Sequence, residues 1–224
     1  LRTPLTIISG YLDNMSIVMS NPAKLLDALK RIGASVKRLE VFAEDVLTIS
    51  RFELGDSELT SEKIKVKDFL SRIVSEFTPS AEIKKITFKT DIQNGDTELN
   101  ISVPYIRSAV WNVLDNAAKF TKEGGEITLT SKIEGDSALI IISDTGIGIS
   151  KDEQSKLFTK FHRGTSTLTY DFEGTGIGFY SSKMMIETHG GTITATSIEG
   201  KGRTFPISIP LTSQIIPLFK SSIF

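Results

Sequence analysis

The chain has 224 residues, of which 39% are hydrophobic and 24% are charged, and its formal net charge is -1. This composition is typical of a soluble globular protein and gives no reason to expect nucleic acid or an anionic membrane surface as a partner. The chain has no cysteine, which excludes a disulfide framework, and no apolar run approaches the ~18 residues of a membrane span.

Residues 1–57 have the pattern of a helical hairpin. The first helix is predicted to run to about Met19, and Ser20-Asn21-Pro22 then supplies a turn and a new helix start. The second helix, predicted from Pro22 to Glu53, carries apolar residues at alternating intervals of three and four. These residues are Leu25, Leu29, Ile32, Val36, Leu39, Ala43, Val46 and Ile49. We expect a homodimer through residues 1–55 that forms a four-helix bundle. The alternative is a hairpin packed on its own second domain.

Residues 63–211 mix strand and helix patterns, which predicts an α+β fold with a sheet packed against helices. The Asn94-Gly95 turn between two strand patterns is a hairpin signal. Strands are predicted at 63–66, 86–90, 99–102, 126–133, 137–143, 192–197 and 204–209, and helices at 68–84, 104–120, 151–158 and 176–188. Residues 212–224 form an apolar tail, which we interpret as a frayed end, with a docking segment as the alternative.

The predicted helix at 104–120 carries a polar face. Asn112, Asn116 and Lys119 are spaced i, i+4 and i+7, which places them on one side of the helix. Carboxamide oxygens are hard ligands suited to Mg²⁺, and a lysine is a point charge for phosphate. The face therefore fits a Mg²⁺-triphosphate, although a solvated helix face is the more frequent meaning of such a pattern.

Two glycine-rich stretches follow. The buried strand pattern 138–143 ends at Asp144, whose carboxylate can accept a hydrogen bond from an exocyclic amine, and Gly146 and Gly148 would let the backbone approach a base. The stretch Gly174-Thr-Gly176-Ile-Gly178 opens a helix, where backbone N–H groups favour phosphate. It is neither a dinucleotide fingerprint nor a P-loop, because the residues that complete those motifs are missing.

In this order, the three motifs resemble the Bergerat ATP-binding fold shared by histidine kinases, type II topoisomerases, a heat-shock chaperone and mismatch-repair ATPases. The resemblance implies that Asp144 reads the adenine amine, that Asn116 with Asn112 holds Mg²⁺, and that Lys119 contacts phosphate. The ATP site that it implies comprises Asn112, Asn116, Lys119, Phe120, Asp144, Gly146, Ile147, Gly148, Phe158, Phe161, Arg163, Gly174, Thr175, Gly176, Ile177 and Gly178.

The segment 157–164 is similar to the phenylalanine box of histidine kinases. By that resemblance, Phe158 and Phe161 anchor a lid hydrophobically, and the polar loop from Arg163 to Glu173 covers ATP. ATP-hydrolysing members of the wider family carry a glutamate in place of Asn112. An amide has no basicity near neutral pH, so the chain is expected to transfer phosphate to a protein nucleophile rather than to water.

The N-terminal half is similar to the dimerisation and phosphotransfer helices of sensor histidine kinases. Leu1-Arg-Thr-Pro4-Leu5 matches the end of the motif His-Glu-Leu-Arg-Thr-Pro-Leu, and 50–55 matches the usual end of the second helix. The phosphoacceptor histidine would lie two residues before Leu1, so the sequence as given is not expected to autophosphorylate. Neither His162 nor His189 is a good substitute, since His162 lies in the lid region and His189 is expected to cap a helix end or to interact with its dipole, before Gly190-Gly191. Thr3 occupies a position that the family links to dephosphorylation of its partner.

The resemblance implies the cytoplasmic kinase core of a membrane-anchored sensor, with a response-regulator receiver domain as partner. Mg-ATP would supply a phosphoryl group to a histidine and then to an aspartate. A protein serine kinase of the same fold is the enzymatic alternative, which the long hairpin at residues 1–55 disfavours. An ATP-binding scaffold or pseudokinase is the non-enzymatic alternative.

Overall fold

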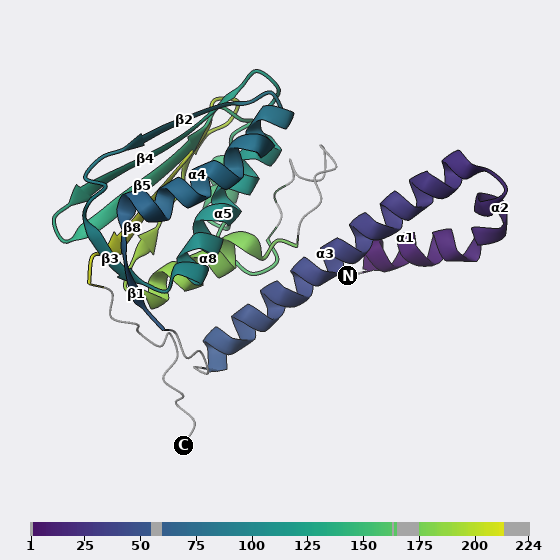
Figure 1. Ribbon diagram of the computed structural model, residues 1–224, viewed down its shortest axis with the longest axis horizontal. Coiled ribbons are helices and arrows are strands. Elements are labelled where there is room, and N and C mark those ends of the chain that lie inside the picture. Colours follow the sequence, from purple (N-terminus) through teal and green to yellow (C-terminus); the bar gives the residue numbers. More distant parts are fainter. Residues whose placement is uncertain (1, 55–59, 163, 165–174, 213–224) are drawn as a thin grey trace. The chain divides into compact units, whose positions relative to one another are not determined.

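Figure 1 shows the chain as a computed structural model, in which residues 2–54, 60–162, 164 and 175–212 are described. The chain divides into two compact units, Leu1–Ser50 and Arg51–Phe224. Some of the predictions concern residues outside the described ranges, namely Arg163, Gly174, most of the lid loop and the tail at 213–224. Within the part of the chain that is described, no helix is both long enough and apolar enough to cross a membrane.

The first unit is a helical hairpin of α1 (Arg2–Asp13), α2 (Met15–Met19) and α3 (Pro22–Leu54). The prediction of one helix up to Met19 is wrong, because the helix is interrupted at Asn14. The Asn14 side-chain amide donates to the Gly10 carbonyl at 2.8 Å, a local bond of the kind that competes with helical pairing. The predicted start of α3 is confirmed, since the Asn21 Oδ1 accepts from the backbone N–H groups of Ala23 and Lys24.

The second unit is built on a six-stranded sheet in the order β2-β4-β5-β8-β6, with β7 also paired to β8. A separate two-stranded sheet pairs β1 with β3. The strands are β1 (Glu62–Lys65), β2 (Thr87–Ile92), β3 (Glu98–Ile101), β4 (Glu126–Glu134), β5 (Ser137–Asp144), β6 (Thr192–Ile193), β7 (Thr196–Ile198) and β8 (Gly202–Pro210).

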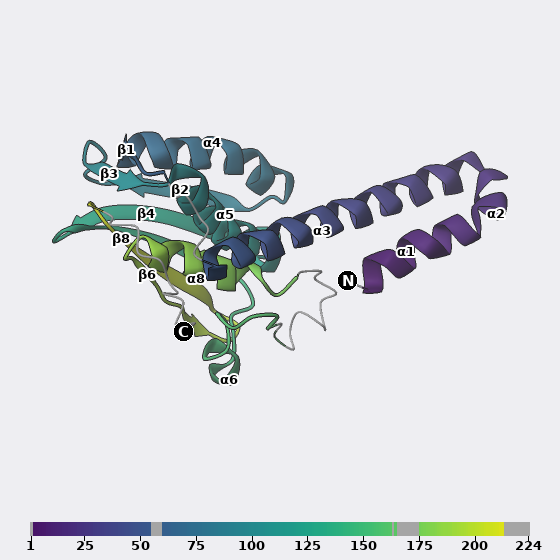
Figure 2. The same cartoon turned by 90° about the horizontal axis from the view of Figure 1, so that it is seen from below.

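Helices α4 (Val66–Ile83), α5 (Val103–Phe120) and α8 (Gly178–Thr188) lie together on one face of this sheet (Figures 1 and 2). Strands β5 and β8 alternate between buried and half-buried residues, as expected where one sheet face meets the helices. The buried positions of β8 are occupied by Phe205, Ile207 and Ile209 and, unexpectedly, by Arg203. This α+β sandwich confirms the predicted fold class.

Three predicted details of the second unit are wrong. Strands β2 and β3 do not form a hairpin across Asn94-Gly95: β2 pairs in parallel with β4, and β3 pairs with β1. Between them, the N–H groups of Val66 and Lys67 donate to the carbonyls of Thr97 and Gly95, so this turn caps the start of α4 instead. Helix α6 is only Lys151–Gln154, short of the predicted Phe158, and residues 192–197 are divided between β6 and β7.

Candidate nucleotide-binding site

Helix α5 presents the predicted polar face at the edge of the core. Its apolar residues Val113, Leu114 and Ala117 are fully buried and fix the helix on the sheet, whereas Asn112, Asn116 and Lys119 are half-buried. The Asn112 Nδ2 donates to the Gly178 carbonyl and to the Ser182 Oγ, both at 3.3 Å. This face of α5 is therefore joined to the first turn of α8, the helix that follows the second glycine-rich stretch.

The two carboxamides are oriented by their nitrogen atoms. The Asn116 Nδ2 donates to the Asn112 carbonyl at 2.7 Å, while the Asn112 Nδ2 is directed towards α8. Each side chain thus uses its donor on the protein, and the oxygen is the atom that it can offer to a cation. Within the described residues, no group of three or more His, Asp or Glu side chains is arranged to hold a metal. The carboxamide pair is the candidate for Mg²⁺ because its oxygens are hard ligands.

Lys119, which is expected to contact phosphate, forms an ion pair within α5. Its Nζ lies 2.5 Å from the Asp115 Oδ2, one turn back on the same helix. Both side chains are partly exposed, so the pair is of the surface type that contributes little to stability. A phosphate would have to compete with Asp115 for this ammonium group.

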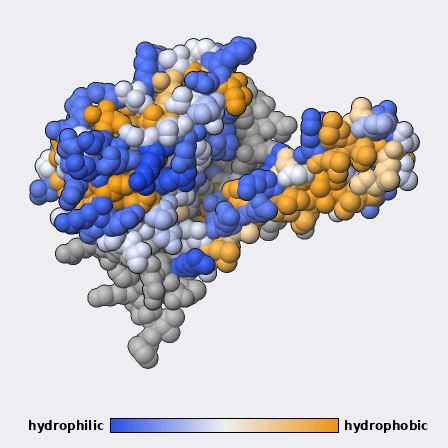
Figure 3. Space-filling model, viewed as in Figure 1, coloured by the Kyte–Doolittle hydropathy of each residue, from blue (hydrophilic) through white to orange (hydrophobic). Residues whose placement is uncertain are grey.

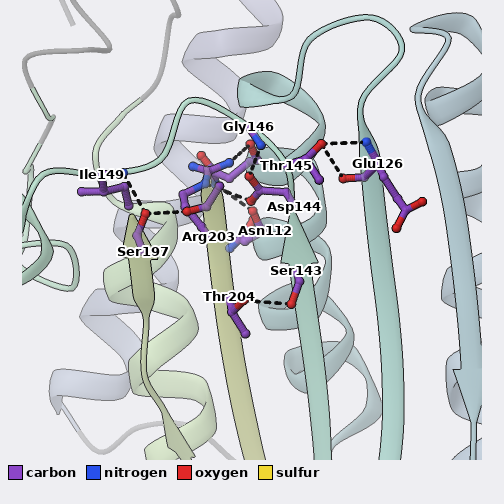
Figure 4. A network of polar contacts seen from close by, with 12 residues as sticks. Asn112, Glu126, Ser143, Asp144, Thr145, Gly146, Ile149, Ser197, Arg203 and Thr204 are labelled. Atoms are coloured by element: carbon purple, nitrogen blue, oxygen red, sulfur yellow. Dashed lines mark hydrogen bonds and ion pairs between the residues drawn. The ribbon is translucent and has the colours of Figure 1, made fainter. Parts of the chain in front are cut away.

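Asp144 lies at the end of β5 with both carboxylate oxygens already accepting hydrogen bonds. The Oδ1 accepts from the Gly146 N–H at 2.9 Å, and the Oδ2 accepts from the Arg203 Nε at 2.9 Å (Figure 4). Asp144 and Arg203 are directly opposite each other in the β5–β8 register, which places both side chains on the helix-facing side of the sheet. Their side chains are 0% and 3% exposed, respectively, so this is a buried ion pair.

The electrostatics of the pair follow from this burial. Burial raises the pKa of the Asp144 carboxyl, and the nearby Arg203 charge and the Gly146 N–H oppose that rise. Burial also lowers the pKa of the Arg203 guanidinium, against the attraction of Asp144. The guanidinium is further held by α5, because its Nη2 donates to the Asn116 carbonyl at 3.0 Å and its carbon lies 4.8 Å from the centre of the Phe120 ring.

The glycines after Asp144 are required by the protein itself. A Cβ at Gly146 would collide with the Phe120 carbonyl at the end of α5, and one at Gly148, where φ is +70°, would collide with the backbone at Ile198. Ile147 donates its N–H to the same Phe120 carbonyl at 3.2 Å. The structure shows the close approach of chain segments to one another at these glycines, and the room that they would make for a base stays a prediction.

The second glycine-rich stretch is described from Thr175 onwards. Gly176 has φ of +71°, and a Cβ there would collide with the backbone of Phe161 and His162. The Thr175 Oγ1 accepts from the Ile177 N–H at 3.2 Å, and α8 begins at Gly178, two residues later than predicted. The start of α8 thus packs both against the phenylalanine box and against Asn112, as the glycines permit.

The two phenylalanines of that box differ. The Phe158 ring contacts Phe179 of α8 edge to face, with 5.9 Å between ring centres, and Phe179 stacks on Phe205 of the core. Phe161 is 61% exposed and has a positive φ of 60°. The anchoring role of Phe161 stays a prediction, because most of the lid that it would anchor lies outside the described residues.

Sequence reasoning missed three polar residues that hold the site together: Arg203, Ser197 and Gln154. The Ser197 Oγ accepts from the Ile149 N–H and donates to the Gly202 carbonyl (Figure 4), and the Gln154 Nε2 donates to the carbonyls of Ile149 and Ser197. Arg203 could have been found from strand periodicity, since it is in phase with Phe205, Ile207 and Ile209. Ser197 and Gln154 carry no such signal.

The described histidine closest to the core cannot act as a phosphoacceptor. His189 is fully buried at the end of α8; its Nε2 accepts from the Ser102 N–H at 3.0 Å, and its Nδ1 lies 2.6 Å from the Met185 carbonyl. Both ring nitrogens are engaged, as expected for a residue that caps the helix. Thr3, the residue implied in dephosphorylation, lies exposed in the first turn of α1.

Comparison with known proteins agrees with this geometry. Residues 102–213 match the family described as histidine kinase-, DNA gyrase B- and HSP90-like ATPase. The sensor histidine kinase WalK of Bacillus subtilis (strain 168) is 31% identical over 94% of this chain, which spans 35% of WalK. The chain thus covers about a third of that relative's length.

Two solved structures share the fold. Full-length ShkA in complex with AMPPNP has a TM-score of 0.73 at 21% identity, covering 88% of this chain and 41% of that one. The histidine kinase ThkA in complex with the response regulator protein TrrA has a TM-score of 0.74 at 23% identity, covering 94% of this chain and 58% of that one. The chain therefore belongs to the family of histidine kinase-, DNA gyrase B- and HSP90-like ATPases.

Proposed function

We propose that this chain is the kinase core of a two-component sensor: it binds Mg-ATP, transfers the γ-phosphoryl group to a histidine on the helical hairpin, and passes it on to an aspartate of a response regulator. The proposal rests on one observation, which is that hydrogen bonds connect the elements carrying the three motifs. Asn112 is hydrogen-bonded to the first turn of α8, and Arg203 joins the Asp144 carboxylate to the Asn116 carbonyl. Candidate groups for base, metal and phosphate therefore lie on connected elements.

The proposed reaction is transfer of the γ-phosphoryl group to a histidine nitrogen rather than to water. In the transfer, the bond between the γ-phosphorus and its bridging oxygen breaks, a phosphorus–nitrogen bond forms, and ADP leaves with the bond electrons. Such a transfer depends on positioning and charge neutralisation more than on covalent chemistry by the protein. Asn112 has no usable basicity, so a water molecule held beside it would not be deprotonated there.

The carboxamide pair fits Mg²⁺ as the accompanying metal. The nitrogens of Asn112 and Asn116 are committed as donors, which leaves hard oxygen ligands, and Mg²⁺ is usually held by few protein ligands together with substrate phosphates. When bound, the metal would neutralise charge on the phosphates. The protein's own contribution is to orient Asn116 through its bond to the Asn112 carbonyl.

Partners and location are part of the proposal. ThkA was solved with a response regulator, and ShkA with AMPPNP, an ATP analogue; we assign the same classes of partner and nucleotide to this chain. We assign to the hairpin the role of a homodimer interface, supported by its exposed apolar side chains. By its resemblance to sensor kinases, the chain would be the cytoplasmic portion of a membrane-anchored sensor.

A calorimetric titration of the chain with ADP, with and without Mg²⁺, tests the nucleotide site directly. We expect saturable binding that strengthens with Mg²⁺, and no comparable binding of GDP; absence of ADP binding would reject the proposal. Transfer is then tested with Mg²⁺ and γ-labelled ATP on the chain joined to the residues that precede Leu1 in its gene. An acid-labile, alkali-stable label would identify a phosphohistidine, whereas bound ATP without label would favour a scaffold.

A further inference from the structure

The buried pair of Asp144 and Arg203 is the feature that the proposed function does not yet explain. A buried charge is costly unless it is paired, and removing one partner of a buried pair is strongly destabilising. Arg203 occupies a core-facing position of β8 whose neighbours in phase are all apolar. A hydrophobic residue would satisfy the packing at this position, so core packing alone does not explain why the residue is an arginine.

The surroundings of Asp144 make Arg203 its sole charged neighbour among the described groups that shift its pKa. From β4, the residue opposite Asp144 is the apolar Ile127, and from the loop it is the main-chain N–H of Gly146. From α5, the contacts are made to Arg203, by the Phe120 ring and the Asn116 carbonyl. Arg203 is thus the one side chain that supports the charge of the carboxylate, and it fixes the rotation together with the Gly146 N–H.

We propose that Arg203 is a positioning residue for base recognition, which holds the Asp144 carboxylate charged and in one rotation so that it can accept the exocyclic amine of adenine. Each carboxylate oxygen has two lone pairs, and the protein donors to the carboxylate are the Gly146 N–H, the Arg203 Nε and the Arg203 main-chain N–H, so acceptor capacity remains for a ligand amine. The inference rests on the proposed function, because it assumes that Asp144 reads the base.

The proposal predicts a specific pH profile for a variant that lacks the guanidinium. Burial already raises the pKa of Asp144, and Arg203 limits that rise. In Arg203→Met, the carboxyl would take up a proton at higher pH, and the protonated oxygen would lose acceptor capacity. We expect ADP to bind about tenfold more weakly near pH 7, the order expected for one hydrogen bond to a charged group. The loss should deepen as the pH is lowered from about 8 to about 6, since a protonated carboxyl oxygen has less acceptor capacity.

Calorimetric ADP titrations across that pH range test the idea with five variants of the whole chain. Arg203→Lys keeps a positive charge and should restore much of the pH profile, and it also serves if Arg203→Met does not fold by circular dichroism. Arg107→Met is the matched control, because Arg107 also pairs with a carboxylate, that of Glu76, and also lies over an aromatic ring, that of Trp111, but at the surface. It should bind ADP as the unmodified chain does.

The remaining variants are Asp144→Asn and the double variant with Arg203→Met. They distinguish the positioning role of Arg203 from the assignment of Asp144 to base recognition. If Arg203 acts through Asp144, removing it from Asp144→Asn should cost little further affinity. Equal affinity and pH profile for Arg203→Met and the unmodified chain would overturn the positioning role while Asp144→Asn still weakens binding. Tighter binding by Arg203→Met would also overturn it, because the guanidinium would then be covering the carboxylate. Unchanged binding by Asp144→Asn would instead reject the base assignment in the proposed function.

Discussion

At the scale of single residues, Asn116 serves two parts of the site through different atoms. Its main-chain carbonyl accepts from the Arg203 Nη2, and its side-chain nitrogen donates to the Asn112 carbonyl. A substitution that keeps the main chain therefore separates the metal role from the base role. This separation is not available at Asn112, whose amide also holds Gly178 and Ser182 of α8.

Replacing Asn116 with alanine is expected to remove most of the Mg²⁺ dependence of ADP binding, because a hard oxygen ligand is lost while the carbonyl that supports Arg203 stays. ADP affinity in Mg²⁺ should fall to about the level found with a chelator, and the melting temperature should change little. Calorimetry with and without Mg²⁺ measures this. Ser108→Ala, two turns earlier on the same helix row, is the control and should keep the full metal effect. Retention of that effect by Asn116→Ala would contradict the ligand assignment.

Replacing Asp144 with asparagine should weaken ADP binding at least about tenfold and also lower the melting temperature. Both carboxylate oxygens accept from N–H donors, so either rotation of an asparagine sets its NH₂ group against a donor. An unsatisfied buried polar group of this kind costs roughly 1–3 kcal/mol. Asp91→Asn, at an exposed position of β2, should leave both quantities unchanged. Normal ADP affinity in Asp144→Asn would mean that the base is read elsewhere.

At the scale of elements, the unit is held by contacts between segments distant in the sequence. His189, at the end of α8, accepts from the Ser102 N–H at the start of α5, 87 residues away. The short turn from β7 into β8 is similarly held in place, since Gly202 packs so closely against the Asp144 carbonyl that a Cβ would collide with it. These contacts orient the two helices and the strand that supply the candidate site.

The buried His189 predicts that stability falls in mild acid. Burial lowers the pKa of its imidazole, so the unfolded chain, with an ordinary value near 6.5, binds the proton more readily than the folded chain. Stability should therefore rise with pH up to about 6.5 and be lost as the pH falls below that value. Denaturant unfolding between about pH 5 and about pH 8 measures this. His189→Gln should flatten the slope around pH 6.5, and an unchanged slope would assign it to other groups.

Two glycines of the β7–β8 turn offer a matched comparison. Gly200 and Gly202 both have positive φ, but a Cβ at Gly200 meets nothing within 4 Å, whereas one at Gly202 collides with the Asp144 carbonyl. Gly200→Ala should cost only the conformational strain, about 1 kcal/mol, and Gly202→Ala should cost several kcal/mol more. Thermal unfolding of the two variants compares them. Equal losses of stability in the two variants would show that the turn can shift to accommodate a Cβ at Gly202 and does not hold Asp144 in place.

The sequence predicted those elements whose information is local. Helix α5 follows from its own periodicity and from Pro104, and the β4–β5 hairpin follows from its alternation around Gly135. The pairing of β2 with β4 could not be read from the Asn94-Gly95 signal, because that turn caps α4, and the choice of strand partner depends on the whole sheet. The Asp144–Arg203 pair depends on the register of strands 59 residues apart. Local patterns do not contain that register.

At the scale of the whole chain, the two units present different surfaces. The second unit has a closed core, whereas the hairpin exposes large apolar side chains along α1 and α3, seen as orange surface in Figure 3. Among the predicted seam residues, Leu29, Val36 and Val46 are exposed, while Ile49 is buried. Apolar surface repeated along both helices is expected to be covered by another chain in solution.

We therefore expect the chain to be a dimer in solution, and Leu29→Glu combined with Val36→Glu to make it monomeric. Leu29 is 53% exposed, so the charge enters no core of the single chain and acts on the dimer alone. Light scattering coupled to size exclusion measures the mass. Lys30→Glu with Lys37→Glu places the same charges one residue further along α3, at exposed positions, and should leave the dimer intact. If the variant with Leu29→Glu and Val36→Glu stayed dimeric, the predicted seam would be wrong. ADP binding should survive in both double variants.

The small β1–β3 sheet has a consequence for how the second unit can be handled. Glu62, at the start of β1, is paired with Ile101, and on the other side of β3 Asn100 bridges to Thr212. The first and last strand-paired residues of the unit thus flank the same end of one short strand. A unit whose two ends are neighbours is suited to transplantation into a surface loop of another protein, or to circular permutation with a short peptide joining the ends.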